Sequence, residues 1–320
     1  MGVRRRVIVI GAGIAGLTAA ALLSSRHDVV VYERAARPGG KVHATPSSLG
    51  PIDSGPTVFT MAWVFEKIFA EAGGAFRERV ELQRLEVLAR HYWRDGSKLD
   101  LFADPARTRD AIRDFAGPAE SRRFEAFERR TRALFDGLLE PFMMASDPSL
   151  PRLIGSRNPF GLLRISPFQT LWRFLETQFK DPRLRQLFGR YATYCGASPF
   201  AAPATLALIA NVEQQGVWTL TGGMSALADA LEALGRTQGA EFVYDAHVSE
   251  ILTQRRGVRL ASGERREADA IVFNGDVAAL RAGDAGPHAA NAVEPAAEAE
   301  PSQSAMTWST TGEADGVDLS

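Results

Sequence analysis

Three glycines near the amino terminus have the spacing that a phosphate-containing ligand requires. Gly11, Gly13 and Gly16 form a G-x-G-x-x-G pattern directly after the apolar run 7–10. In such a pattern the first glycine allows a tight turn, the second lets the backbone approach a pyrophosphate, and the third lets a helix pack closely on a strand. The following helix offers N–H groups and positive potential to the phosphates. The pattern therefore indicates dinucleotide binding.

The elements around these glycines complete a nucleotide-binding unit. Residues 7–10 predict a buried parallel strand, residues 17–23 a helix, and residues 28–32 a second strand. Glu33 follows the second strand, 22 residues beyond Gly11. Its carboxylate is placed to accept hydrogen bonds from ribose hydroxyls and disfavours a 2′-phosphate. NAD and FAD both remain open at this point.

Two further glycine-containing segments follow the second strand. Residues 37–41 read RPGGK, and residues 53–57 read DSGPT. Both segments could bring backbone close to a long ligand, although two surface turns would use the same residue types. They resemble motifs of the flavin-containing amine oxidase and carotenoid desaturase superfamily, in which R-x-G-G follows the second strand and D-x-G-P-T lines the flavin. The resemblance implies FAD as the cofactor.

The resemblance extends from residue 5 to about residue 276 and is strongest in four segments. These segments are residues 53–73, 92–117, 193–206 and 216–231. Within the superfamily the chain is most similar to the 1-hydroxycarotenoid 3,4-desaturases, also called hydroxyneurosporene or methoxyneurosporene dehydrogenases. Members of this family continue beyond the point where this chain ends, so the resemblance implies a C-terminally truncated chain with an incomplete isoalloxazine site.

Carried over position by position, the resemblance assigns residues to the cofactor site. The residues expected there are Gly11, Gly13, Ile14, Ala15, Gly16, Glu33, Arg34, Gly39, Gly40, Lys41, Asp53, Gly55, Pro56, Thr57 and Val248. Val248 matches a position whose backbone contacts the adenine side. Residues 222–224 match a glycine turn where the chain returns to the cofactor domain. No catalytic acid or base is assigned, because a flavin carries the redox step itself.

The fold class expected from the resemblance and the local patterns is α/β. It combines a Rossmann-like FAD-binding domain of the amine oxidase or phytoene desaturase type with a largely helical inserted substrate domain. The FAD-binding domain is expected over residues 1–75 and 216–280, the substrate and membrane-associating domain over 76–215, and a linker with the start of an incomplete C-terminal portion over 281–320. Periodicity predicts a helix over residues 57–72, two helices within 104–139 and a helical middle to about residue 215. Short strands are predicted at 242–244, 248–252, 258–261 and 270–273.

The implied function is FAD-dependent desaturation of a 1-hydroxy or 1-methoxy carotenoid by hydride transfer to the flavin. Another flavin oxidoreductase, such as an amine or protoporphyrinogen oxidase, and a non-catalytic nucleotide-binding fragment are the alternatives. An isoprenoid substrate would need an apolar tunnel. The tunnel rests on the family resemblance, since aromatic residues at helical spacing are more often ordinary core. The aromatic residues available for it are Phe142, Phe160, Phe168, Trp172, Phe174, Phe179, Phe188, Tyr191 and Tyr194.

Charge patterning suggests a membrane surface as a partner. Residues 149–175 contain four arginines, no acids and many apolar residues. Such a stretch can dock on anionic lipid, although a solvated face would look the same. We therefore expect peripheral attachment at the cytoplasmic face of the membrane.

The overall composition disfavours other classes of function. The chain carries 37 Lys and Arg against 38 Asp and Glu, a net charge of -1, so no global positive field recruits nucleic acid. Cys195 is the only cysteine, which excludes an intrachain disulfide, and we expect a buried thiol. The five histidines are scattered and predict no metal site.

Overall fold

The computed structural model describes residues 3–145, 169–252, 256–293 and 308–312. These residues form two compact units. Unit 1 comprises the described residues within 1–83, 219–299 and 307–320, and unit 2 those within 84–218. The divisions fall inside β6 (Leu82–Arg84) and β9 (Val217–Leu220). They lie near, and not at, the limits expected for the functional domains.

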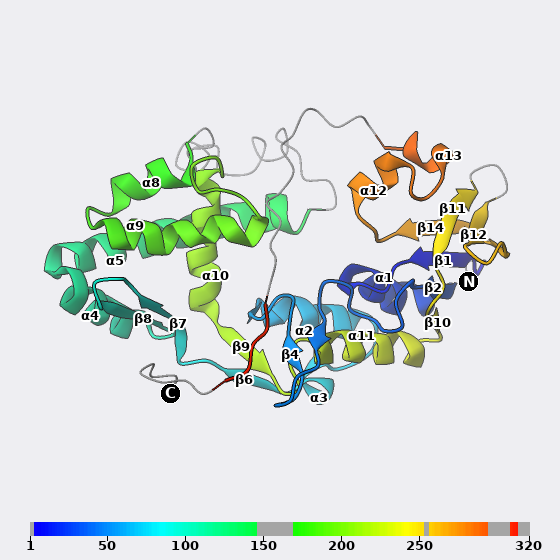
Figure 1. The fold of residues 1–320 in the computed structure, drawn as a ribbon, viewed down its shortest axis with the longest axis horizontal. Coiled ribbons are helices and arrows are strands. Elements are labelled where there is room, and N and C mark those ends of the chain that lie inside the picture. Colours follow the sequence, from blue (N-terminus) through cyan, green and yellow to red (C-terminus); the bar gives the residue numbers. More distant parts are fainter. Residues whose placement is uncertain (1–2, 146–168, 253–255, 294–307, 313–320) are drawn as a thin grey trace. The chain divides into compact units, whose positions relative to one another are not determined.

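Unit 1 is built on a four-stranded sheet with the order β10-β2-β1-β14, which Figure 1 shows beside helix α1. The strands are β1 (Arg6–Ile10), β2 (Asp28–Tyr32), β10 (Glu241–Val243) and β14 (Ala270–Phe273). Every neighbouring pair is parallel. Parallel strands need a crossover connection, and α1 (Ile14–Ser24) supplies it between β1 and β2. The predicted strand, glycine turn, helix and second strand are confirmed.

The parallel sheet lies between two other layers. Side chains alternate along a strand, so Ile8 and Tyr32 face one side. There they pack with Val248, Val258 and Leu260 of an antiparallel sheet made of β11 (Val248–Leu252), β12 (Gly257–Leu260) and β13 (Arg265–Glu267). On the other side α1 contacts β1 and β2, and α11 (Ser225–Thr237) contacts α1. This is the expected α/β nucleotide-binding architecture.

The rest of unit 1 contains short elements that the sequence analysis did not predict, and it differs from the prediction at the start of one helix and after residue 280. The further elements are β3 (Ala44–Thr45), β4 (Ile52–Asp53), β5 (Phe59–Thr60), α2 (Ala62–Glu71), α3 (Phe76–Arg79), α12 (Val277–Ala282) and α13 (Pro287–Ala290). The helix predicted over 57–72 begins only at Ala62, because β5 pairs with β9 and Met61 has a left-handed φ of 52°. The segment from residue 281, expected as linker, contains the end of α12 and all of α13.

Unit 2 is largely helical, as predicted, with one antiparallel hairpin that the sequence analysis missed. Its elements are β7 (Val87–Tyr92), β8 (Lys98–Phe102), α4 (Pro105–Ala116), α5 (Pro118–Leu138), the π-helix η1 (Leu139–Met143), α8 (Leu171–Gln178), α9 (Pro182–Gly189), the 3-10 helices η2 (Arg190–Cys195) and η3 (Ala204–Leu208), and α10 (Ile209–Gln215). Asp104 caps α4 by accepting the Ala106 N–H at 2.8 Å, with Pro105 at the first helical position. Cys195, expected to be buried, is exposed at the end of η2.

The core of unit 2 is aromatic. The Phe188 ring lies 4.9 Å from Phe127 and 5.0 Å from Phe179, centroid to centroid. Phe174, Phe179, Phe188 and Tyr191 are at most 2% exposed. These four side chains are therefore packed in the core of unit 2, which is the ordinary alternative to a tunnel wall. Phe160, Phe168 and most of the basic stretch 149–175 lie outside the described residues.

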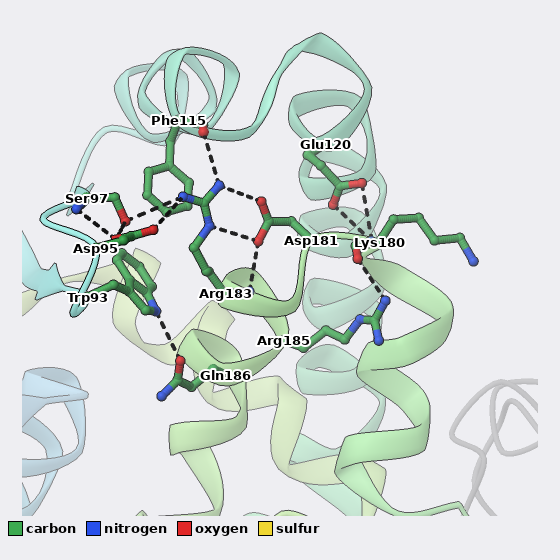
Figure 2. A network of polar contacts seen from close by, with 10 residues as sticks. All are labelled: Trp93, Asp95, Ser97, Phe115, Glu120, Lys180, Asp181, Arg183, Arg185 and Gln186. Carbon is green, nitrogen blue, oxygen red and sulfur yellow. Dashed lines mark hydrogen bonds and ion pairs between the residues drawn. The ribbon is translucent and has the colours of Figure 1, made fainter.

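A polar network joins the hairpin, α4 and α9 within unit 2, as Figure 2 shows. Arg183 forms a fork to Asp181, with Nη2 at 2.8 Å from Oδ2 and Nε at 3.2 Å from Oδ1. Its guanidinium lies over the Phe115 ring, 4.0 Å from the centroid, and donates to the Phe115 carbonyl at 3.4 Å. Arg183 also reaches the Ser97 hydroxyl in the hairpin loop at 3.4 Å. One side chain therefore connects three elements that are distant in sequence.

Candidate nucleotide site

The glycine turn after β1 is held by its neighbours on several sides. The Gly11 N–H donates to the Tyr32 carbonyl at 2.8 Å, and Gly11 itself has a φ of 97°, which favours glycine. The Ala12 N–H donates to Oε2 of Glu33 at 2.6 Å. The Ala12 carbonyl accepts from the Gly39 N–H at 2.8 Å. The first glycine motif, the acid after β2 and the second glycine pair, predicted separately, therefore meet at one place.

The amino end of α1 opens at this turn. Gly13 is its N-cap residue, no side chain caps it, and its first turn contains no acid. The first N–H groups of a helix have no partner inside the helix, so those of Ile14 and Ala15 are suited to an anion. A methyl group on Gly16 would overlap the Gly11 carbonyl oxygen. Gly16 is therefore required for the close approach of α1 to the turn.

A cavity of about 960 Å³ lies beside this turn within unit 1. Such a volume is at the upper end of the usual range for small-molecule and cofactor sites, roughly 300–1,000 Å³. The predicted residues that line it are Gly11, Gly13, Ile14, Glu33, Arg34, Gly39, Gly40, Lys41 and Val248. Arg34 and Lys41 add positive charge to the lining. Nine residues chosen from separate segments are thus brought to one cavity.

The other predicted residues have different surroundings. Ala15, Gly16, Asp53, Gly55, Pro56 and Thr57 are absent from the cavity lining. Both carboxylate oxygens of Asp53 accept the Met224 N–H, at 3.0 and 2.9 Å, where α11 begins. A methyl group on Gly55 would overlap the Lys41 carbonyl oxygen. Asp53 therefore binds the start of α11 and Gly55 packs against Lys41, whereas Ala15, Pro56 and Thr57 are exposed.

Several lining residues were missed by the sequence analysis. They are Ile10, Tyr32, Val42, Ala246, His247, Phe273, Asn274, Gly275, Asp276, Ala279, Asp284 and Ala285. Asn274 to Asp276 follow β14 directly, and ligands of parallel α/β sheets bind at the carboxyl ends of the strands. That rule applied to the last predicted strand would have found these three residues. Asp284 and Ala285, which follow α12, lie at no strand end, so this rule could not have found them.

The lining suits the ribose and pyrophosphate of a dinucleotide. The Glu33 side chain accepts two backbone N–H groups, from Ala12 and from Ala35 at 2.8 Å. A carboxylate has roughly four acceptor positions, so positions remain for ribose hydroxyls. A Cβ at Gly40 would lie 3.3 Å from the Gly13 Cα, which shows how closely the two glycine segments approach. The residues present therefore fit the ADP half of FAD.

Unit 2 contains a second group of polar side chains around the buried Glu213, which the sequence analysis missed as a group. The Glu213 carboxylate accepts hydrogen bonds from Nη1 and Nη2 of Arg190, with N–O distances of 2.9 and 2.7 Å. It also accepts hydrogen bonds from the hydroxyl groups of Tyr191 at 3.1 Å and Tyr194 at 2.7 Å. Burial, and then the nearby Glu213 carboxylate, raises the pKa of Tyr194 to about 12. The Glu213 carboxylate and both tyrosine hydroxyls are hydrogen-bonded within this cluster, whereas the buried Nε of Arg190 has no hydrogen-bond partner.

The part of the chain that the structure describes contains neither a cluster of metal-ligating side chains nor a helix able to cross a membrane. No group of three or more His, Cys, Asp or Glu side chains there could hold a metal ion. No helix there combines the length and the apolar character that crossing a membrane requires.

The sheet order, the glycine turn and the cavity define a dinucleotide-binding protein of the Rossmann-like class. Residues 14–305 match the family described as flavin containing amine oxidoreductase. The hydroxyneurosporene desaturase of Rubrivivax gelatinosus is 48% identical over 322 residues, which cover 98% of this chain and 61% of that protein. The enzyme of the same name from Cereibacter sphaeroides is 42% identical over 98% of this chain and 65% of its own.

The chain belongs to the flavin-containing amine oxidoreductase family, whose cofactor is FAD. It spans less than two thirds of the length of the two desaturases. A solved structure of a putrescine oxidase variant is 16% identical, with a TM-score of 0.58, covering 87% of this chain and 59% of that one. This last likeness concerns the fold alone.

Proposed function

We propose that the protein to which this chain corresponds desaturates a carotenoid with FAD as the oxidant, and that its substrate carries a 1-hydroxy or 1-methoxy group. The observation that supports this most directly is the 48% identity to a hydroxyneurosporene desaturase along 98% of the chain. The redox step, which FAD supplies when bound, would remove a hydride from one of the two carbon atoms that become the new double bond, and the other carbon atom would lose a proton.

The residues of unit 1 would hold the ADP half of the cofactor. The N–H groups of Ile14 and Ala15 would donate to the pyrophosphate, and Glu33 would accept hydrogen bonds from the ribose. Val248 lines the cavity at the end expected to hold the adenine. None of these groups performs the redox chemistry, and their part is to bind and orient.

Cofactor binding is tested by titrating the purified chain with FAD and recording absorbance and calorimetry. We expect one FAD per chain. Binding of a nicotinamide dinucleotide in its place would contradict the assignment. Desaturation is then tested with a hydroxylated carotene in lipid vesicles, where a longer conjugated system shifts the absorption to the red. An unchanged carotenoid together with oxidation of an amine or a porphyrinogen would favour the other flavin oxidoreductases.

A non-catalytic role is distinguished by the same experiment. A chain that binds FAD and leaves it oxidised with every substrate would be a nucleotide-binding protein without turnover. The similarity to desaturases, which extends through unit 2 as well as unit 1, favours the enzyme.

We also propose that the protein attaches to the cytoplasmic face of a membrane. A carotenoid dissolves in lipid, and the stretch 149–175 with its four arginines has the composition for anionic headgroups. The test is flotation with vesicles of anionic lipid, with neutral vesicles as the control. Protein that stays in the soluble fraction with both would contradict this proposal.

A further inference from the structure

Asn274 lies against the glycine turn although it is 263 residues from Gly11 in sequence. It follows β14, which pairs with β1 on the side opposite β2. Its backbone N–H donates to the Ile10 carbonyl at 2.9 Å, which continues the pairing of the two strands by one residue. This backbone contact directs the Asn274 side chain to the place where β1 ends and the turn begins.

The side-chain amide of Asn274 occupies the inside of the turn. Its Nδ2 donates to the Gly11 carbonyl oxygen at 3.3 Å. A methyl group on Gly13 would lie 3.1 Å from Nδ2, and one on Gly16 would lie 2.8 Å from it. A methyl group on Gly11 would lie 3.1 Å from the Asn274 backbone oxygen. All three glycines of the motif therefore leave room for this one residue.

The charge of the group at this position matters as much as its shape. The nitrogen end of the amide must face Gly11, because the carbonyl oxygen there can only accept. A carboxylate of the same shape would set an oxygen against that carbonyl and add a negative charge beside a site for anions. The neutral amide avoids both effects.

We propose that Asn274 is a positioning residue for the phosphate-binding turn. It holds the Gly11 carbonyl in place and adds no negative charge to the turn beyond that of Glu33, so that the N–H groups of Ile14 and Ala15 stay available to the pyrophosphate. This inference rests on the proposed binding of FAD. Asn274 does not take part in the redox step.

The test compares two variants that differ in shape and charge. Asn274→Ala removes the amide, and Asn274→Asp keeps its shape and adds charge. Asn291→Asp, exposed at the end of α13, is the matched control. Calorimetry with ADP, FAD and adenosine gives the affinities. We expect a loss of about tenfold for ADP with Asn274→Ala and a larger loss with Asn274→Asp, from the usual worth of one hydrogen bond and the added repulsion. Adenosine affinity and the control should match the wild type.

Which of the two variants binds ADP more tightly shows whether Asn274 positions the turn or only fills space. If Asn274 merely filled space, the isosteric Asp would bind ADP better than Ala does, and that result would overturn the proposal. Equal losses for ADP and adenosine would overturn it too, because they would mean general damage to the cavity.

A second measurement needs no nucleotide. Hydrogen exchange of the free protein should accelerate at residues 11–16 in both Asn274 variants and remain slow along β1 and β2. Acceleration throughout β1, β2 and the turn alike, or no acceleration at the turn, would contradict the role of Asn274. If the wild type binds neither ADP nor FAD, the proposed function fails, whereas the exchange result still decides whether Asn274 holds the turn.

Discussion

The Glu33 carboxylate, expected to accept hydrogen bonds from ribose hydroxyls, also binds the backbone of the glycine turn, because its Oε2 accepts the Ala12 N–H at 2.6 Å. Glu33 directly follows β2 and is 8% exposed. Its second oxygen accepts the Ala35 N–H at 2.8 Å. The acid is therefore both part of the turn and part of the cavity wall, so a change at Glu33 affects stability and binding together.

Replacing Glu33 by Gln should destabilise the free protein and weaken FAD binding. Gln has one acceptor oxygen and an NH₂ group, which would confront one of the two backbone donors. Since a hydrogen bond to a charged group contributes about 1.5–3 kcal/mol, we expect a loss of about 2 kcal/mol in the free energy of unfolding. Urea denaturation and FAD titration check this. Glu241→Gln, exposed on β10 of the same sheet, should change neither quantity.

The glycines of the motif should respond differently to alanine. On Gly16 the methyl group would overlap the Gly11 carbonyl oxygen, so Gly16→Ala should lower the melting temperature of the free protein by several degrees. Gly13 has an ordinary φ of -72°, and its methyl group would press on the Asn274 amide, which lies 3.1 Å away. We therefore expect the Gly13→Ala variant to fold normally and to bind FAD more weakly than the wild type.

The control for the glycine variants is Gly137→Ala. Gly137 lies in α5 with open space where a methyl group would stand, so Ala there should be neutral or stabilise by up to about 1 kcal/mol. A melting temperature of Gly16→Ala equal to that of Gly13→Ala would contradict the distinction between the two glycines.

The elements around the nucleotide site were predictable because their signals are local. The run 7–10, the glycine spacing and Glu33 lie within one short stretch, and each part follows from the residues beside it. The hairpin β7–β8 had a signal of the same kind that was missed. Asp95 and Gly96 form its turn, with a φ of 79° at Gly96, and an Asp-Gly pair between two strands is a strong hairpin indication.

The remaining site residues could not be predicted from local patterns. Asn274 contacts Gly11 only because β14 pairs with β1, and that pairing depends on the whole sheet. Asp53 was expected beside the flavin, and it binds the N–H of Met224, which is 171 residues away. In unit 2, the side chains that surround Glu213 meet through the packing of η2 against neighbouring helices. Contacts between residues that are far apart in sequence leave no periodic pattern in the sequence from which they could be predicted.

Asp53 should stabilise the start of α11. A negative charge at a helix amino terminus and a hydrogen bond to its first N–H groups each contribute about 0.5–1.5 kcal/mol. We expect Asp53→Asn to lower the free energy of unfolding by about 1 kcal/mol, and Asp53→Ala to lower it further, because no acceptor then remains for Met224. Chemical denaturation checks both. Asp104→Asn, which keeps a good cap on α4, should be nearly neutral.

Arg183 should not tolerate replacement by Lys. An ammonium group can neither form the fork to Asp181 nor lie flat on Phe115, so Arg183→Lys should cost about 1–2 kcal/mol (Figure 2). Arg129→Lys, in an exposed pair with Glu125 on α5, is the control and should change stability by less than about 0.5 kcal/mol. Equal effects of the two variants on urea denaturation would contradict the role of the fork.

The ion pair between Arg183 and Asp181 also predicts that the stability of the protein falls at low pH. The hydrogen bond from Arg183 holds the pKa of Asp181 below its usual value. A depressed folded-state pKa means that the stabilisation is present above the unfolded pKa of about 3.9 and is lost as the pH falls through the folded value. Arg183→Lys should therefore lose less stability than the wild type when the pH is lowered from about 5 to 3. Parallel acid denaturation curves would argue against the coupling.

His91 on β7 should make the protein less stable in mild acid. Its Nε2 is buried without a hydrogen-bond partner, and burial, followed by the charge of Arg190, lowers its pKa. Glu213 and Asp100, the acids that face it, act in the opposite direction and are the smaller effects. Because the pKa is lowered in the folded protein, the stabilisation from neutral His91 is fully present above the pKa of the unfolded chain, about 6.5. It is lost as the pH falls from there toward the pKa of the folded protein, by at most about 1.4 kcal/mol per pH unit.

His91→Phe, whose ring can keep the contact with Trp93, removes the titrating group and the unpaired nitrogen. Urea denaturation at pH 7.5 and 5.5 should show a smaller loss on acidification for His91→Phe than for the wild type, and an equal or larger loss would contradict this origin of the pH dependence.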